Sequence, residues 1–228
     1  MADEQEDNRE ENPENVLPPE PEIELPPPVP PAVIMLDLPL LAKCVSKVGK
    51  AFDGLSYAYT DLVVEEKELE EIGNAIKDFK SLRSVSLNKN LLRSIKEIKD
   101  LPYLLALKAS QNQIEEIDFC DEPDKLTYLQ TIDLSQNVIT ELPKINIINL
   151  LTLNLSTNQI TTTINFNGHP LLTRLELRRN KLTDFKGISN LPNLQELYIA
   201  ENEIMSFEGL ENVPSLKVLH MRKNPVNP

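Results

Sequence analysis

Tryptophan is absent from the sequence, and cysteine, histidine, glycine and aromatic residues are scarce. The 228 residues include two cysteines, two histidines and six glycines, and aromatic side chains make up 5% of the chain. Cys44 and Cys120 lie far apart and form no CxxC motif, which favours a reducing compartment over a disulfide framework. The glycines form no phosphate-binding loop, and His169 and His220 have no accompanying set of nucleophile and carboxylate. The sequence therefore predicts a protein that is not an enzyme and has no metal site, cofactor or small-molecule substrate.

Long apolar runs are also lacking. The most apolar stretch, residues 32–42, is interrupted by Asp37 and Pro39 and is too short to cross the roughly 30 Å of bilayer hydrocarbon. The N-terminus is acidic and has no signal-peptide pattern. We therefore expect a cytoplasmic protein with no membrane partner.

Basic charge is in deficit, and the deficit is uneven along the chain. The formal net charge is −13, and residues 1–31 contain ten acidic side chains against one base, Arg9. This segment therefore carries −9 of the charge and the remainder carries −4. The acidity says little about what the folded part binds, and the charge balance argues against a nucleic-acid partner.

The N-terminal segment, residues 1–31, also holds nine of the eighteen prolines. It has too little apolar surface to offset the entropy of ordering, so we predict a disordered acidic tail. Its LPPPVPP run, Leu25 to Pro31, favours polyproline II. The run would serve either as a ligand for an aromatic groove on a partner or as a stiff spacer.

The most informative feature of the sequence is an internal repeat. The stretch LQTIDLSQNVI, residues 129–139, is one of seven copies that place leucine, two aliphatic residues, asparagine and a final aliphatic residue at fixed offsets. The asparagines are 22, 25, 21, 22, 22 and 22 residues apart, which is the period of a leucine-rich repeat. These asparagines are Asn90, Asn112, Asn137, Asn158, Asn180, Asn202 and Asn224.

The repeat predicts an α/β solenoid, a curved leucine-rich-repeat array. Alternating apolar residues predict a strand in each unit, and stacked strands would form a parallel sheet on the concave face, with helical or 3₁₀ segments outside. A degenerate unit at Tyr59 to Ile72, with Lys67 in place of asparagine, brings the count to about eight repeats over residues 59–228. Asparagine both donates and accepts, so a stacked row of them can hydrogen-bond the turn after each strand. His169 stands where other repeats have leucine, which favours a packed structural histidine over a ligand.

Residues 32–58 are predicted to form an N-terminal helical cap over the first repeat. Asp37 and Pro39 are typical of a helix start and Gly54 of a helix end, so we expect a helix to about Asp53. Its apolar face would consist of Leu41, Cys44, Val45, Val48 and Phe52. This position favours a core role for Cys44 over a reactive thiol.

The concave sheet face is the surface expected to bind a partner, because its outward positions vary between repeats. In repeats two to five these positions are small and mostly uncharged, as at Thr131, Asp133 and Ser135. In repeats six to eight they are charged or aromatic, and we name the following residues the sheet-face patch: Arg174, Glu176, Arg178, Arg179, Glu196, Tyr198, Glu201, His220, Arg222 and Lys223. Arginine and tyrosine often dominate interface energetics, which indicates a protein-binding patch, and ordinary solvated strand positions are the alternative.

The repeat is similar to the 22-residue class shared by the repeat regulator of protein phosphatase one, a dynein light chain and the spliceosomal A-prime protein. Less generic residues give a narrower resemblance. They are GLSYAYTDLVVEEKELEEI at Gly54 to Ile72, LLALKASQN at Leu104 to Asn112, and the pair His169 and Pro170. These residues resemble the leucine-rich-repeat family of ciliary radial-spoke components.

The narrower resemblance implies a non-enzymatic scaffold in the cytoskeleton of the cilium or flagellum. It implies a place in the axoneme, where the protein would help to join the stalk and head of a radial spoke and would bind their subunits. The broader resemblance leaves a second hypothesis open, a regulatory subunit that holds a protein phosphatase catalytic subunit on the concave face. An RNA-associated role, implied by the likeness to the spliceosomal protein, is a third.

Overall fold

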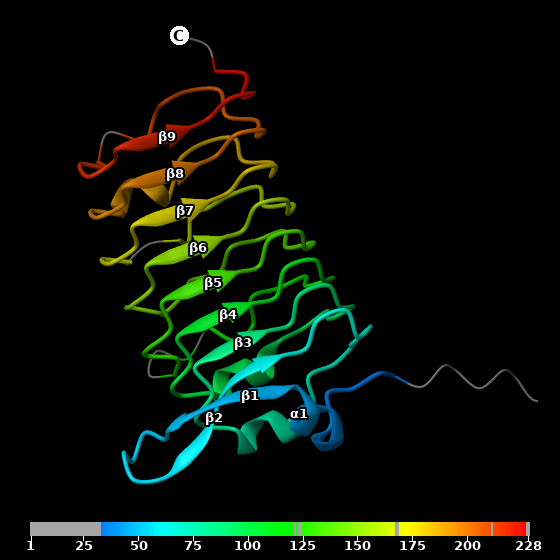
Figure 1. The fold of residues 1–228 in the computed structure, drawn as a ribbon. Helices are drawn as coiled ribbons and strands as arrows, with labels where there is room; N and C mark the ends of the chain where they lie inside the picture. Colours follow the sequence, from blue (N-terminus) through cyan, green and yellow to red (C-terminus); the bar gives the residue numbers. More distant parts are fainter. Residues whose placement is uncertain (1–32, 121, 123–124, 167–168, 211, 227–228) are drawn as a thin grey trace, which may run out of the picture. The chain divides into compact units, whose positions relative to one another are not determined.

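The computed structural model describes residues 33–120, 122, 125–166, 169–210 and 212–226. The predicted disordered tail and its proline-rich run lie outside these residues. Residues Val33–Pro228 form one compact unit, built on a nine-stranded sheet whose strands, β1 to β9, follow one another in sequence order (Figure 1). No helix in the described part of the chain is both long and apolar enough to span a bilayer.

The chain enters the sheet through a short helix and a β-hairpin, not through the long helix expected from the sequence. Helix α1, Leu38–Cys44, starts as predicted, with the Asp37 carboxylate accepting a hydrogen bond from the Leu40 N–H at 2.9 Å. The helix ends at Cys44, and strand β1, Val45–Lys50, then runs antiparallel to β2, Tyr57–Val63. The prediction of a helix to about Asp53 was wrong.

Local preference and the sheet edge together explain the hairpin. Val45 and Val48 are β-branched and Gly49 is a poor helix former, so the segment favours pairing with the open edge of β2. The Asp53 carboxylate closes the turn by accepting hydrogen bonds from the N–H and the hydroxyl of Ser56, at 2.9 and 2.7 Å. These hydrogen bonds lower the pKa of the Asp53 carboxyl.

The hairpin changes which residues of the cap are buried. Leu41 is buried and Cys44 is half-buried against the core, in agreement with the predicted apolar face. Val48 and Phe52, assigned to the same face, are each 62% exposed. The Phe52 ring instead stacks on Tyr103, two repeats further along, with ring centroids 4.1 Å apart. The cap is therefore fastened to the array by an aromatic contact at the surface as well as by its core residues.

From β2 onward each strand pairs in parallel with the next, so the described residues contain eight parallel strands. The strands after β2 are β3 Ser84–Ser86, β4 Ala106–Lys108, β5 Thr131–Asp133, β6 Thr152–Asn154, β7 Arg174–Glu176, β8 Glu196–Tyr198 and β9 Val218–His220. Figure 1 shows them stacked one per repeat. The predicted solenoid with a parallel sheet is confirmed.

Each parallel strand contributes one residue to a row that faces the core, and these residues are in register across the sheet. The row consists of Leu62, Val85, Leu107, Ile132, Leu153, Leu175, Leu197 and Leu219. All are buried except Leu219, which is 36% exposed. Burial of one such side chain contributes about 1.5–3 kcal/mol. Because successive side chains of a strand alternate, the residues on either side of this row lie on the open face of the sheet.

On the outer side the chain returns through short 3₁₀ segments and turns. The regular segments are η1 Asn74–Asp78, η2 Lys96–Asp100 and η3 Ile188–Asn190. Cys120 lies in the longest repeat, in which the asparagines are 25 residues apart, and it is buried.

The repeat asparagines link each turn to the repeat before it. Asn158 donates from Nδ2 to the carbonyls of Leu155, in its own repeat, and Leu134, in the preceding one, both at 3.0 Å. Its Oδ1 accepts the N–H of Ile139, also at 3.0 Å. The same pattern is made by Asn90, Asn112, Asn137, Asn180, Asn202 and Asn224.

The residue before each asparagine adopts a left-handed backbone, although none of these residues is glycine. The residues are Lys89, Gln111, Gln136, Thr157, Arg179, Glu201 and Lys223, with φ between 54° and 60°. Such a conformation costs about 1–2 kcal/mol for an L-residue. The hydrogen bonds of the following asparagine hold the turn in this conformation. The turn therefore fixes how residues after the strand are presented.

His169 packs inside the array, as the sequence favoured. Its ring is 1% exposed and stacks on Phe166 with centroids 4.4 Å apart. Neither ring nitrogen has a hydrogen-bond partner within the described residues. Burial lowers the pKa of the His169 imidazole, and the nearby Ile147 backbone offsets only part of this effect. Burial in the core therefore favours the neutral form of this histidine.

Replacing a ladder asparagine is expected to destabilise the whole array. Asn158→Ala leaves the buried Ile139 N–H without its acceptor and removes one of the two asparagine donors from each of the Leu134 and Leu155 carbonyls. We therefore expect the free energy of unfolding in urea to fall by about 1–3 kcal/mol. The control is Asn149→Ala, which removes one solvent-exposed hydrogen bond, to the carbonyl of Thr127, and should cost about 0.5 kcal/mol. Equal unfolding midpoints for the two variants would contradict the ladder.

The buried histidine is expected to make stability depend on pH. Below pH about 6.5 the unfolded chain binds a proton at His169 that the folded chain resists, so the free energy of unfolding should fall by up to about 1.4 kcal/mol per pH unit. Above that pH both states are neutral and the effect is absent. His169→Leu should flatten this part of the profile in urea melts between pH 8 and pH 5. Parallel profiles for the parent and the variant would contradict the assignment.

Candidate functional site

The ten residues of the sheet-face patch come from three neighbouring strands and the turns that follow them. Strands β7, β8 and β9 supply Arg174, Glu176, Glu196, Tyr198 and His220. The turns supply Arg178, Arg179, Glu201, Arg222 and Lys223. Arg179, Glu201 and Lys223 are the left-handed residues that precede the asparagines, so the ladder fixes their backbone.

A hollow of about 610 Å³ lies over this part of the sheet, and we call it the sheet-face hollow. Six patch residues line it, namely Glu176, Arg178, Arg179, Glu201, His220 and Arg222. The other four patch residues, Arg174, Glu196, Tyr198 and Lys223, do not line it. The lining also includes Ser135, Gln136, Asn154, Ser156, Thr157 and Ala200. The structure therefore joins the charged end of the sheet to the small polar residues of repeats four and five.

Three of these lining residues were missed by reasoning from the sequence. Gln136 and Thr157 occupy the left-handed position before the asparagine, the same offset as Arg179 and Glu201. Ala200 lies one residue before Glu201. The repeat offset was a usable signal, because it already identified the corresponding charged residues in later repeats.

Arg174 is occupied by contacts within the protein. Its guanidinium pairs with Glu176 at 2.7 Å and with Glu196 at 2.6 Å, and the Tyr198 hydroxyl donates to Glu196 at 3.0 Å. The hydrogen bond to the Glu176 carboxylate raises the pKa of the Arg174 guanidinium. This network crosses β7 and β8 and leaves Arg174 with little free charge for a partner.

Glu201 holds two further cations of the patch. Its carboxylate pairs with Arg179 at 3.2 Å and with Lys223 at 3.4 Å, across three successive repeats. The hydrogen bond from Arg179 lowers the pKa of the Glu201 carboxyl. Ion pairs as exposed as these contribute little to stability. Their effect on the site is to balance local charge.

The Tyr198 ring contacts three other residues of the sheet-face patch. The His220 ring stacks on it with centroids 4.9 Å apart, and the guanidinium carbons of Arg178 and Arg174 lie 4.3 and 4.6 Å from its centroid. Within the described residues, Arg178 and Arg222 form no ion pair with a carboxylate. These two arginines are the available positive charge of the sheet-face hollow.

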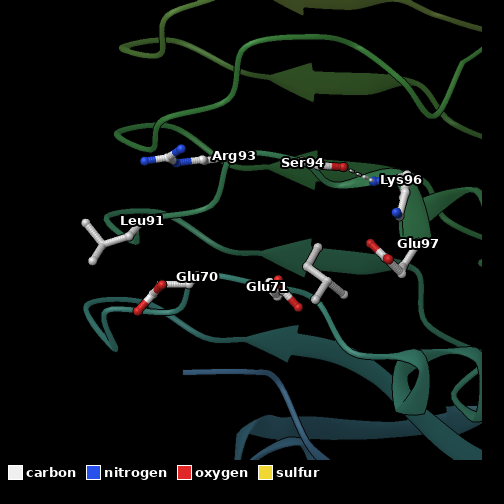
Figure 2. A pocket seen from close by; sticks show the side chains of 8 residues that line it. Glu70, Glu71, Leu91, Arg93, Ser94, Lys96 and Glu97 are labelled. Atoms are coloured by element: carbon white, nitrogen blue, oxygen red, sulfur yellow. Dashed lines mark hydrogen bonds between the residues drawn. The ribbon is translucent and has the colours of Figure 1, made fainter. Parts of the chain in front are cut away.

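A second hollow, of about 380 Å³, lies at the other end of the array, after the strands of the first two repeats. Figure 2 shows its labelled side chains spread along this edge, with Leu91 and Arg93 at one end and Lys96 and Glu97 at the other. The Lys96 N–H donates to the Ser94 hydroxyl at 3.4 Å. Cations and carboxylates alternate here without converging on one point. We therefore place the candidate site on the sheet face.

The described residues contain no group of three or more histidine, cysteine or acidic residues arranged to hold a metal ion. Cys44 is half-buried and Cys120 is buried. The arrangement of the sheet-face patch is suited to contacts with another molecule.

Comparison with known proteins agrees with the fold and the repeat. A family model described as leucine-rich repeats, in two copies, matches residues 170–212. Human leucine-rich repeat-containing protein 23 is 34% identical over 141 residues, which are 61% of this chain and 40% of that protein. The chain therefore spans less than half the length of this relative.

Solved structures give the same fold. Internalin C2 of Listeria monocytogenes superposes with a TM-score of 0.68 at 24% identity, covering 74% of each chain. A leucine-rich-repeat protein of Leptospira interrogans superposes with a TM-score of 0.67 at 27% identity, covering 74% of this chain and 44% of that one. The repeats, the parallel sheet and the asparagine ladder thus give the chain a leucine-rich-repeat fold, and its sequence is similar to leucine-rich repeat-containing protein 23.

Proposed function

We propose that this chain is a non-enzymatic scaffold for protein–protein interaction and that it belongs to the radial spokes of the ciliary axoneme. There it would help to join the stalk and head of a spoke. Leucine-rich-repeat proteins are typically non-enzymatic interaction proteins. The fold supports the interaction role, and the assignment to the axoneme rests on sequence resemblance.

The observation that carries the interaction role is the sheet-face patch. Two arginines without carboxylate partners, a tyrosine and a histidine converge there beside the sheet-face hollow. Arginine and tyrosine are enriched among the residues that dominate binding energy. In β7 and β8 the central side chain is buried in the core, and the side chains on either side of it lie on the other face of the sheet. A partner would therefore meet a surface that the array already holds rigid.

The support for the axoneme comes from sequence resemblance. Residues 54–72 and 104–112 resemble ciliary radial-spoke proteins of this repeat type, and the similarity to leucine-rich repeat-containing protein 23 is consistent with that resemblance. In the structure, residues 54–72 include β2, the first strand of the parallel sheet. The resemblance therefore falls on the entry into the array.

Charge reversal on the patch is expected to release the partner in cilia. A tagged full-length chain should co-purify with axonemes and cross-link to spoke subunits. The double variant Arg178→Glu and Arg222→Glu should lose these cross-links by about tenfold or more, because it places negative charge on the binding face. Arg93→Glu, at the hollow outside the sheet face, is the matched control and should keep them.

Two results would overturn the proposal. One is a tagged chain that spreads through the cytosol and is missing from purified axonemes. The other is a stoichiometric phosphatase catalytic subunit on the sheet face without spoke proteins, which would favour the regulatory-subunit hypothesis. Unchanged cross-linking by the double variant would move the binding site away from the patch.

A further inference from the structure

We propose that the sheet-face hollow binds an acidic segment of a partner protein, with Arg178 and Arg222 contacting its carboxylates. The inference rests on the proposed function, because it names the chemistry of the partner that the same face would bind. It follows from which charges of the hollow are already paired, from how Arg178 is held, and from the polarity of the remaining lining.

The first step is the charge left over after internal pairing. The carboxylates that line the hollow, Glu176 and Glu201, are paired, the first with Arg174 and the second with Arg179 and Lys223. Arg178 and Arg222 line the same hollow and have no carboxylate partner within the described residues. Two guanidinium groups of the lining are therefore available to a partner, although the formal charge of the chain is −13.

The second step is the restraint on Arg178. Its guanidinium carbon lies 4.3 Å from the centroid of the Tyr198 ring, and that ring is itself stacked on His220. A guanidinium held against an aromatic face keeps its N–H edge free for an acceptor. Because the side chain is already ordered, binding would cost less conformational entropy.

The third step is the neutral part of the hollow. Ser135, Asn154 and Thr157 supply polar side chains without charge. A carboxylate accepts hydrogen bonds from hydroxyl and amide donors as well as from a guanidinium, so one ligand group matches both the neutral and the cationic part of the lining.

The same lining argues for a protein carboxylate and against a phosphate chain. Binding along a nucleic-acid backbone needs an array of cations that neutralises successive phosphates. Here two available arginines are flanked by the carboxylates of Glu176 and Glu201, which would repel a densely charged polyanion. A peptide with spaced acidic side chains has a charge density that fits the hollow.

The test is binding of a labelled peptide to the full-length chain, followed by fluorescence anisotropy. The probe is a fluorescein-labelled peptide of alternating glutamate and glycine, with glutamine and lysine versions as matched peptides. We expect the glutamate peptide to bind and the other two not to bind, with affinity falling as salt is raised. Arg178→Gln and Arg222→Gln should each weaken binding about tenfold, and Arg93→Gln should leave it unchanged.

The inference is overturned if the glutamine peptide binds equally well, if the two patch variants bind like the parent, or if a single-stranded RNA oligonucleotide binds more tightly than the glutamate peptide. Failure of the proposed function would look different. If the glutamate peptide fails while charge reversal still removes axonemal cross-links, the scaffold role stands and the acidic partner is wrong. If the peptide binds as expected but the chain is absent from axonemes, the chemistry stands and the axonemal role is wrong.

Discussion

The constraint on which this structure depends is the turn at the end of every repeat strand. There the chain leaves the sheet through a left-handed residue, and its peptide groups point into the array where water does not reach them. Asparagine can hydrogen-bond these buried peptide groups because its side chain both donates and accepts. Asn158 donates to the carbonyls of Leu134 and Leu155 and accepts the N–H of Ile139. The same contacts recur at each asparagine from Asn90 to Asn224 and join each repeat to the one before it.

This constraint also shapes the candidate site. The left-handed position is free to vary in side chain, since only its backbone is fixed, and it carries Gln136 and Thr157 in the middle of the array and Arg179 and Glu201 further along. The sheet-face hollow is lined by these positions. The element that stabilises the fold therefore also presents residues that differ from one repeat to the next.

Internal pairing decides which of the charged residues remain available. Arg174, Arg179 and Lys223 are each matched by a glutamate from the same or a neighbouring repeat. Within the described residues Arg178 and Arg222 have no carboxylate partner, and Arg178 lies over the Tyr198 ring. Although the patch contains both cations and carboxylates, its unpaired charges are positive. Electrostatic complementarity therefore favours a negatively charged partner.

The sequence by itself determined the repeats, the parallel sheet, the inward rows and the packed state of His169, because fixed apolar spacing allows the units to stack in one way. It did not determine the cap, where the edge of β2 offered strand pairing that outweighed the helical pattern after Cys44. Nor could it show which cations of the patch are free. That depends on ion pairs between residues about one repeat apart, such as Arg174 with Glu196, and only the register of the folded sheet brings their side chains within reach.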